Sequence, residues 1–159
     1  MLHIDIICVG KLKETYLKDA IFEYSKRLSK YCILNIIELQ DEKIPEKIND
    51  KIADEVKQKE CTKILNAIKK DSYIIALDLK GKELSSEDFS KKIENICNYN
   101  STITFIIGGS LGLTNELLSK VNEKVCFSLM TFPHQLIRLF LIEQIFRSFK
   151  IINNETYHR

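Results

Sequence analysis

The residues best suited to holding a small ligand are the glycines of residues 108–112, which read Gly-Gly-Ser-Leu-Gly and follow the apolar segment 103–107. Glycine adopts positive φ easily and lets the backbone approach a ligand closely, so the amides and carbonyls of this turn could bind an adenine or a ribose. The turn fits neither the G-x-G-x-x-G nor the G-x-x-x-x-G-K-[ST] motif for nucleotide phosphates. A tight turn between a strand and a helix, with no ligand, is the alternative interpretation.

A second turn of the same kind occurs at residues 130–134, with the sequence Met-Thr-Phe-Pro-His. Ligands of α/β proteins gather at the carboxyl ends of strands, so two such turns indicate one shared pocket. Pro133 is compatible with the first turn of a helix. His134 and Arg138 lie four residues apart on that helix, so both side chains could point from its start toward the glycine-rich turn.

The helix predicted for residues 133–150 is apolar around most of its circumference rather than along one stripe. One face can pack on a sheet, and the rest needs another partner. We therefore predict a two-fold homodimer through this helix, with burial inside one subunit as the alternative. Glu143 and Arg147 are four residues apart and could simply pair on the surface. The apolar residues are Leu136, Ile137, Leu139, Phe140, Leu141, Ile142, Ile145, Phe146 and Phe149.

The chain ends on Tyr157, His158 and Arg159, which have polar chemistry and no obvious packing role. Terminal segments of this kind usually fray. The alternative is a functional tail, because these side chains can stack on an unpaired base and bond to its edge or phosphate, as proteins commonly do with looped RNA.

Length and charge limit the class of protein. The chain has 159 residues, of which 24 are basic and 22 acidic, for a formal net charge of +2. This length predicts one domain over residues 1–159. No apolar segment approaches the roughly 20 residues that span a bilayer, and the N-terminus does not resemble a signal peptide. We therefore expect a soluble cytoplasmic protein with no membrane partner.

The five cysteines, at positions 8, 32, 61, 97 and 126, are odd in number and widely separated. This spacing predicts neither a disulfide framework nor a zinc site. We expect reduced and mostly buried thiols. A catalytic thiol is the alternative, and it would need one of only three histidines as its partner.

Strands and helices alternate along the chain. Apolar runs followed by turn residues predict strands, and apolar residues three or four apart predict helices. Such alternation favours an α/β fold with a mostly parallel sheet flanked by helices. Residues 40–49 are charged, contain Pro45 and predict a mobile loop of the kind that acts as a lid. We expect strands at 2–9, 33–39, 73–79, 101–107 and 124–128, and helices at 16–31, 50–70, 85–97, 114–121 and 133–150, with 80–82 stopping the third strand.

Several strings together carry a family resemblance. They are residues 105–112, residues 130–135, Glu143-Gln144 with Arg147, and Tyr157-His158, together with 9–13 and 77–84. With these strings in this order, the chain closely resembles, over its full length, the SPOUT methyltransferases that act on bacterial large-subunit ribosomal RNA. Phe146 and Ser148 depart from the family, whose members often have tyrosine and alanine there, which puts one phenol hydrogen bond in doubt.

The resemblance implies an S-adenosylmethionine-dependent enzyme that methylates N3 of pseudouridine-1915 in helix 69 of 23S rRNA, acting on assembled ribosomes. It also implies a C-terminal trefoil knot, which short unthreaded connections would not have suggested. It implies no metal, because a methyl sulfonium needs none. A net charge of +2 fits a preformed ribosomal surface recognised by shape better than tight capture of free RNA.

Matched motif to motif, the resemblance assigns the cofactor to the end of the third strand and to the two turns. Apolar walls and backbone amides suit an adenine, while Leu129 occupies a variable position where only a backbone contact is expected. The cofactor residues implied are Leu77, Gly108, Phe127, Ser128, Leu129, Met130, Thr131 and Phe132.

The acceptor nitrogen lies between two carbonyls and must lose a proton, so the site needs a base or a charge that stabilises the anion. Arg138, His134 and His158 are the candidates. Our hypothesis is that Arg138 stabilises or orients the base, and that Tyr157 and His158 from the partner subunit complete the RNA pocket. Two other readings stay open, a non-catalytic ribosome-binding or assembly protein and a generic nucleotide-binding module.

Overall fold

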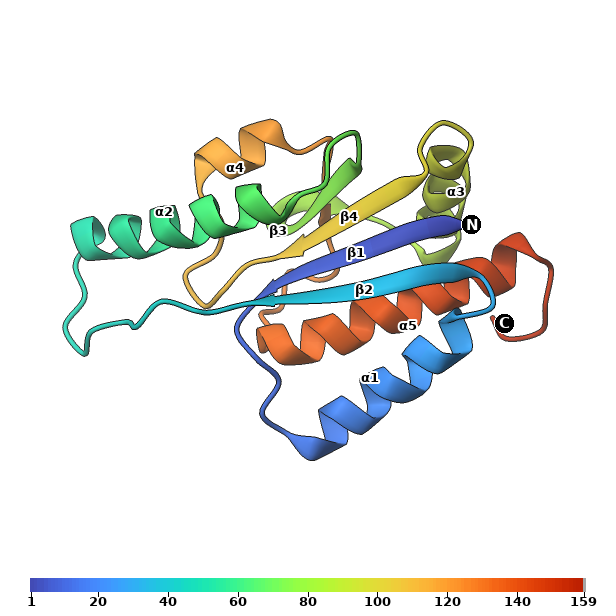
Figure 1. Cartoon of the computed structure of the whole chain (residues 1–159), viewed down its shortest axis with the longest axis horizontal. Helices are drawn as coiled ribbons and strands as arrows, with labels where there is room; N and C mark the ends of the chain where they lie inside the picture. The colour runs from blue at the N-terminus through green and yellow to red at the C-terminus, as the bar shows by residue number, and fades with distance from the viewer. Residues whose placement is uncertain (159) are drawn as a thin grey trace.

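The computed structural model describes residues 1–158 and contains every strand and helix that the sequence predicts. The boundaries differ by a few residues, except at the third strand. The elements are β1 Leu2–Val9, α1 Thr15–Leu28, β2 Cys32–Leu39, α2 Asp50–Ala67, β3 Tyr73–Glu83, α3 Ser86–Cys97, β4 Thr102–Ile107, α4 Asn115–Lys120, β5 Glu123–Cys126 and α5 His134–Ile152 (Figure 1).

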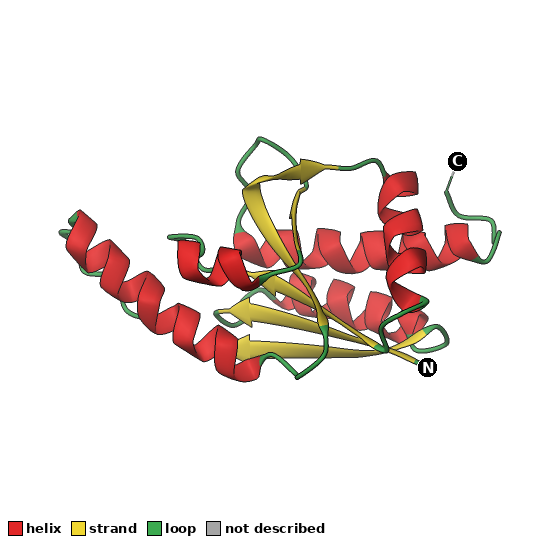
Figure 2. Ribbon diagram, turned by 90° about the horizontal axis from the view of Figure 1, so that it is seen from above, coloured by secondary structure: helices red, strands yellow, loops and turns green. Residues whose placement is uncertain are grey.

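The five strands form one parallel sheet in the order β2-β1-β4-β3-β5 (Figure 2). The predicted α/β fold with a mostly parallel sheet is confirmed. β4 lies between β1 and β3, so the most apolar strands occupy the centre. Because parallel strands end at the same edge, the segments that follow β3, β4 and β5 are brought together there.

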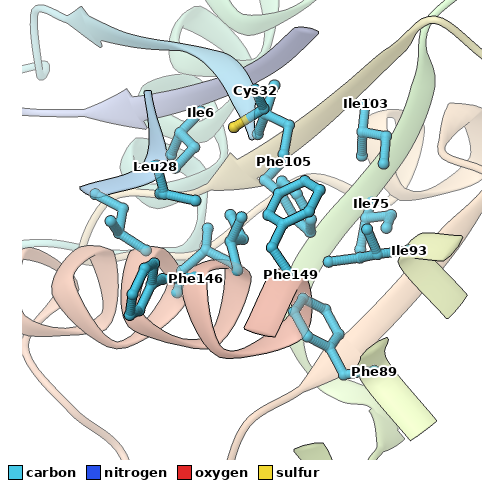
Figure 3. Packing of buried hydrophobic residues seen from close by; sticks show 14 of the residues in the cluster. Ile6, Leu28, Cys32, Ile75, Phe89, Ile93, Ile103, Phe105, Phe146 and Phe149 are labelled. Atoms are coloured by element: carbon cyan, nitrogen blue, oxygen red, sulfur yellow. The ribbon is translucent and has the colours of Figure 1, made fainter. Parts of the chain in front are cut away.

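The helices cover both faces of the sheet. Apolar side chains of α1, α3 and α5 share one hydrophobic cluster with the sheet, and those of α2 and α4 share a second. Figure 1 shows α1 and α5 on one side and α2 and α4 on the other. In the larger cluster, Phe89 of α3 lies 6.1 Å from Phe105 of β4 between ring centroids (Figure 3). The same cluster packs the middle and end of α5 against the sheet, α1 and α3.

The third strand does not stop at residues 80–82 as predicted. β3 continues to Glu83, with a register shift in its pairing with β5, so that both Leu77 and Lys82 pair with Val125. A Cβ on Gly81 would lie 2.6 Å from the backbone of Val125. The glycine therefore allows two strands to approach closely rather than ending one, and residues 78–81 bulge out of the ladder.

Most of the apolar circumference of α5 is covered within one chain. Its buried side chains include Leu141, Ile142, Ile145 and Phe149, which pack against the sheet and the neighbouring helices. Phe140 is the most exposed of its large apolar residues, at 37 % of its surface, and Leu136, Ile137 and Leu139 are half-buried. The homodimer thus stays a prediction, with a smaller apolar surface to support it than the sequence indicated. Among the described residues, no helix has the length and apolar character to cross a membrane.

Candidate functional site

A cavity of about 770 Å³ opens at the carboxyl edge of the sheet, where the segments after β4 and β5 meet the bulge of β3. Its volume lies within the range of roughly 300–1,000 Å³ that is usual for small-ligand sites. Both turns singled out from the sequence line it, as predicted. Seven of the eight predicted cofactor residues are among its walls: Leu77, Gly108, Phe127, Ser128, Met130, Thr131 and Phe132.

The glycine-rich turn is shaped by its own backbone. The amide of Gly112 donates to the carbonyl of Gly109 over 3.0 Å, and Gly112 has a φ of 82°. A Cβ on Gly108 would lie 2.8 Å from Cδ2 of Leu113. Glycine at position 108 therefore leaves room that any side chain would fill, and the backbone itself forms this wall of the cavity.

The turn after β5 forms the opposite wall. Ser128 fixes its start, because Oγ of Ser128 accepts a 3.0 Å hydrogen bond from the amide of Met130. Phe132 packs edge-on against Phe140 of α5 at a centroid distance of 5.6 Å. Leu129 does not line the cavity, and its side chain is 76 % exposed.

Glu60 of α2 is a buried acid that the sequence did not single out. Only 5 % of its surface is exposed, and burial raises the pKa of its carboxyl. Both carboxyl oxygens lie 3.0 Å from where a Cβ of Gly109 would be. Glu60 therefore lies against the glycine-rich turn and leaves no room for a side chain at position 109. Its helical position among charged residues gave no sequence signal for this contact.

His134 and Arg138 do not act on the same part of the site. His134 lines the cavity, and burial lowers the pKa of its imidazole. Arg138 is fully buried and donates to Glu38 over 2.8 Å and to the carbonyl of Gly10 over 3.1 Å. Arg138 therefore binds the end of β2 and the segment after β1. The prediction that its side chain points toward the glycine-rich turn is wrong. An apolar helix gave no indication of this buried ion pair.

Glu38 is the acceptor that orders the segment after β1. Burial alone raises the pKa of its carboxyl, but hydrogen bonds from Arg138 and from the amide of Leu12 lower it overall. Lys13 donates its amide to Oε1 of Gln135 over 3.2 Å. The segment 10–13 is thus held on the first turn of α5, next to the cavity.

The C-terminal tail folds back on α5 of its own chain instead of fraying. The hydroxyl of Tyr157 donates to Oε1 of Glu143 over 3.0 Å, and its ring packs on Phe146 at 5.0 Å. His158 lies 2.7 Å from Glu87 and 3.1 Å from Arg147 between bonding atoms. Burial raises the pKa of Tyr157. Arg159 lies outside the described residues.

Arg147 lies at the centre of these contacts, a role that its sequence motif did not reveal. We call Glu143, Arg147, Tyr157 and His158 the tail cluster. Arg147 pairs with Glu143 over 2.7 Å, as the spacing predicted, and its guanidinium carbon lies 4.8 Å from the centroid of the Tyr157 ring. The pair is partly buried rather than simply a surface pair. The family string Glu143-Gln144 with Arg147 connected this residue to Glu143 but not to the tail.

A second cavity, of about 570 Å³, lies between the first cavity and the tail cluster. It shares Val125, Phe127, Ser128 and Phe132 with the first cavity. Glu143 lines it as well, and this residue also accepts the bonds from Arg147 and Tyr157. Within one chain the tail therefore adjoins the second cavity and does not line the first.

The cysteines are free thiols, and four of the five are buried. Burial raises the pKa of Cys8 to about 12, which disfavours a reactive thiolate. The expectation of reduced, mostly buried thiols is confirmed. Among residues 1–158, no three His, Cys, Asp or Glu side chains gather as a metal site would require.

A family model described as "Predicted SPOUT methyltransferase" matches residues 2–158. The chain belongs to the SPOUT methyltransferase family. It is 57 % identical over 159 residues to the "Ribosomal RNA large subunit methyltransferase H" of Clostridium acetobutylicum, covering 99 % of this chain and 100 % of that protein. It is 58 % identical over 160 residues to a protein of the same name from Clostridium botulinum strain Eklund 17B, with the same coverage.

Solved structures of low sequence identity share the fold of this SPOUT chain. One is a probable methylase family protein from Haemophilus influenzae, with a TM-score of 0.56, 12 % identity and coverage of 98 % of this chain and 70 % of that chain. Another is the TrmH/SpoU tRNA modifying enzyme of A. aeolicus, with a TM-score of 0.52, 13 % identity and coverage of 94 % and 77 %. At such identity these likenesses concern the fold alone.

Proposed function

We propose that this SPOUT methyltransferase transfers a methyl group from S-adenosylmethionine to N3 of a pseudouridine, at position 1915 in helix 69 of 23S rRNA, in assembled ribosomes of the cytoplasm. The observation that carries the proposal is the cavity between the two turns, in a chain with full-length relatives named as large-subunit rRNA methyltransferases. The family resemblance extends the proposal to a C-terminal trefoil knot.

The walls of the first cavity suit S-adenosylmethionine. Leu77, Ile107 and Phe127 offer apolar surface to an adenine, and the glycine-rich turn offers backbone amides and carbonyls. Lys57 also lines the cavity and supplies a cation for a carboxylate. When bound, this cofactor supplies an electrophilic methyl group and needs no metal. Gly108 and the turn after β5 then orient it from opposite sides.

The residues of the tail cluster are proposed to serve the acceptor base. The imide N3 must lose its proton, and a base or a hydrogen-bond donor near the two carbonyls makes that loss easier. Tyr157, His158 and Arg147 present a phenol, an imidazole and a cation from one cluster. We propose that Tyr157 and His158 hold the base. In the dimer, the tail cluster of one subunit would complete the RNA pocket of the other subunit.

Arg138 is proposed as a positioning residue. Its guanidinium is fully buried and committed to Glu38 and Gly10, so it acts on the base only through the segment that it holds. That segment reaches the cavity at His134, because a Cβ on Gly10 would lie 3.5 Å from Nε2 of His134. His134 supports the wall of the cavity from the first turn of α5.

The homodimer is supported by apolar residues left exposed beside the two cavities. Leu129 and Met130 are 76 % and 72 % exposed, and Phe140 is 37 % exposed. Exposure of a single apolar residue is ordinary, but Met130 lines the first cavity and Phe140 the second, so the exposed apolar residues border the site. Analytical ultracentrifugation of Phe140→Asp should show a monomer if this surface forms the interface. A dimer of unchanged stability would place the interface elsewhere.

The function is tested by reverse transcription. Methylation at N3 blocks the Watson–Crick face of the base. Reverse transcriptase should therefore stop one nucleotide before the modified pseudouridine in wild-type rRNA, and it should read through this position in rRNA from a strain lacking this gene. Restoring the gene should restore the stop. A stop that persists after deletion would overturn the assignment. Ribosome binding without any methylation would instead favour the non-catalytic alternative.

A further inference from the structure

Helix α1 carries a stripe of cations and one aromatic ring on its outer side. Leu17, Ile21 and Leu28 face the core and are buried. Lys18, Phe22 and Lys26 lie at intervals of four residues, away from that buried face, and all three are exposed. Side chains four apart lie on one side of a helix, so the stripe is about 12 Å long. Phe22 is 71 % exposed, which is unusual for its size.

The lysines of this stripe are not neutralised by the rest of the chain. Among residues 1–158, no carboxylate forms a salt bridge with Lys18 or Lys26, nor with Lys11 or Lys13 in the segment that precedes α1. Two exposed acids border the stripe: Glu23 pairs with Arg27, and Asp19 forms no salt bridge with either lysine of the stripe. Four exposed lysines without a salt bridge therefore lie within residues 11–26, with the exposed ring of Phe22 between two of them.

This surface is continuous with the candidate site. Lys11 and Lys13 are exposed and belong to the segment that Arg138 and Gln135 fix on the start of α5. That segment contacts His134, a wall residue of the first cavity. The exposed lysines therefore lie on a segment next to the cavity and on the helix that follows it. Figure 1 shows α1 on the side of the sheet opposite α2.

We propose that Lys11, Lys13, Lys18 and Lys26, with Phe22 between the last two, form an RNA-binding surface that we call the α1 basic face. The lysines contact phosphates, and Phe22 stacks on an unpaired base. Cations with an exposed ring among them match the way proteins hold single-stranded or looped nucleic acid. The inference rests on the proposed function, because it supplies the contacts that guide the RNA to the cavity. A protein of small net charge needs such a local surface.

Two pairs of variants test this face. Lys18→Ala/Lys26→Ala removes two cations eight residues apart, and Lys51→Ala/Lys59→Ala removes a matched exposed pair from α2 on the other side of the sheet. The control for Phe22→Ala is Tyr99→Ala, which also removes an exposed aromatic ring, since Tyr99 is 89 % exposed. For each variant we would measure the dissociation constant for purified ribosomes at several salt concentrations. Circular dichroism checks the fold, and calorimetry measures affinity for S-adenosylmethionine.

The α1 lysine variant should bind ribosomes more weakly, and its plot of log affinity against log salt should be shallower by roughly 1.4 to 1.8, as expected for two lost phosphate contacts. Phe22→Ala should weaken binding roughly tenfold at all salt concentrations. Both controls should match the wild type, and affinity for S-adenosylmethionine should be unchanged in all four variants.

Unchanged ribosome affinity and salt slope in the α1 variants would overturn the inference while leaving the proposed function in place. A change in oligomeric state without a change in ribosome affinity would also overturn it, because the face would then bind a second copy. A third outcome combines two results: the α1 variants bind ribosomes more weakly, and the wild-type protein methylates no rRNA. This outcome would support the inference and overturn the proposed function.

Discussion

Arg138 of α5 and Glu38 of β2 form an ion pair over 2.8 Å, although they are 100 residues apart in the sequence. The Arg138 side chain is fully buried, and that of Glu38 is 35 % exposed. The same guanidinium holds the carbonyl of Gly10, so one side chain joins three segments near the cavity.

Arg138→Ala should therefore destabilise the fold as well as the site. Removing one member of a buried pair leaves the other without its partner, which costs about 3 kcal/mol for a carboxylate that keeps some contact with water. Urea unfolding would measure the loss. Arg138→Lys should not restore full stability, because one ammonium cannot reach both acceptors in the same geometry. Wild-type stability in Arg138→Ala would show that the pair does not hold these segments.

Gly81→Ala tests the close pairing of β3 and β5. A methyl group at this position meets backbone atoms at 2.6 Å, and backbone cannot move aside as a flexible side chain can. We expect a loss of about 2 kcal/mol or more in the free energy of unfolding. We also expect weaker binding of S-adenosylmethionine, since residues 78–80 of the bulge line the cavity. Equal stability of the variant and the wild type would contradict the observed register.

The double variant Tyr157→Phe/His158→Ala tests the tail. It removes the hydroxyl bond to Glu143 and the imidazole contacts with Glu87 and Arg147. We expect methyl transfer to ribosomes to fall roughly 100-fold or more, as when acid-base groups are lost, with affinity for S-adenosylmethionine retained. Tyr16→Phe, at an exposed tyrosine of α1, serves as the control. If the double variant kept full activity and RNA affinity, the tail hypothesis would be abandoned.

The folding stability that Glu155 contributes near the C-terminus should depend on pH. Hydrogen bonds from Lys150 and Tyr31 lower the pKa of its carboxyl from 4.5 to about 2. Because the folded-state pKa is depressed, the stabilisation is present above pH 4.5 and is lost as the pH falls toward 2. Glu155→Gln lacks this titration, so its stability should converge on that of the wild type over this window. Acid unfolding followed by circular dichroism would measure it, and a constant difference between the two proteins would contradict the assignment.

The sequence was sufficient for the elements and for the main cavity, because both depend on local signals. Apolar runs and helical spacing predicted each strand and helix, and glycine at residues 108–112 predicted a backbone-lined pocket. Gly81 was misread because a glycine that ends a strand and one that admits a neighbouring backbone look alike in sequence. Only the pairing partner, Val125, distinguishes them.

The contacts that sequence reasoning missed join separate segments of the chain. Arg138 pairs with a residue 100 positions away, and Glu60 meets Gly109 across the helix and sheet layers. The tail was ambiguous for the same reason, since its partners Glu87 and Glu143 have no sequence pattern that connects them to His158 or Tyr157. Side-chain pairing between distant segments follows from the fold and has no local signature.

Methylation of ribosomes by the purified protein would test the proposed activity itself. Ribosomes from a strain lacking this gene would be incubated with the protein and S-adenosylmethionine, and helix 69 of the 23S rRNA would then be read by reverse transcription. We expect a new stop one nucleotide before the target pseudouridine, and this stop should require the cofactor. Continued read-through, with a folded protein that binds S-adenosylmethionine, would contradict it.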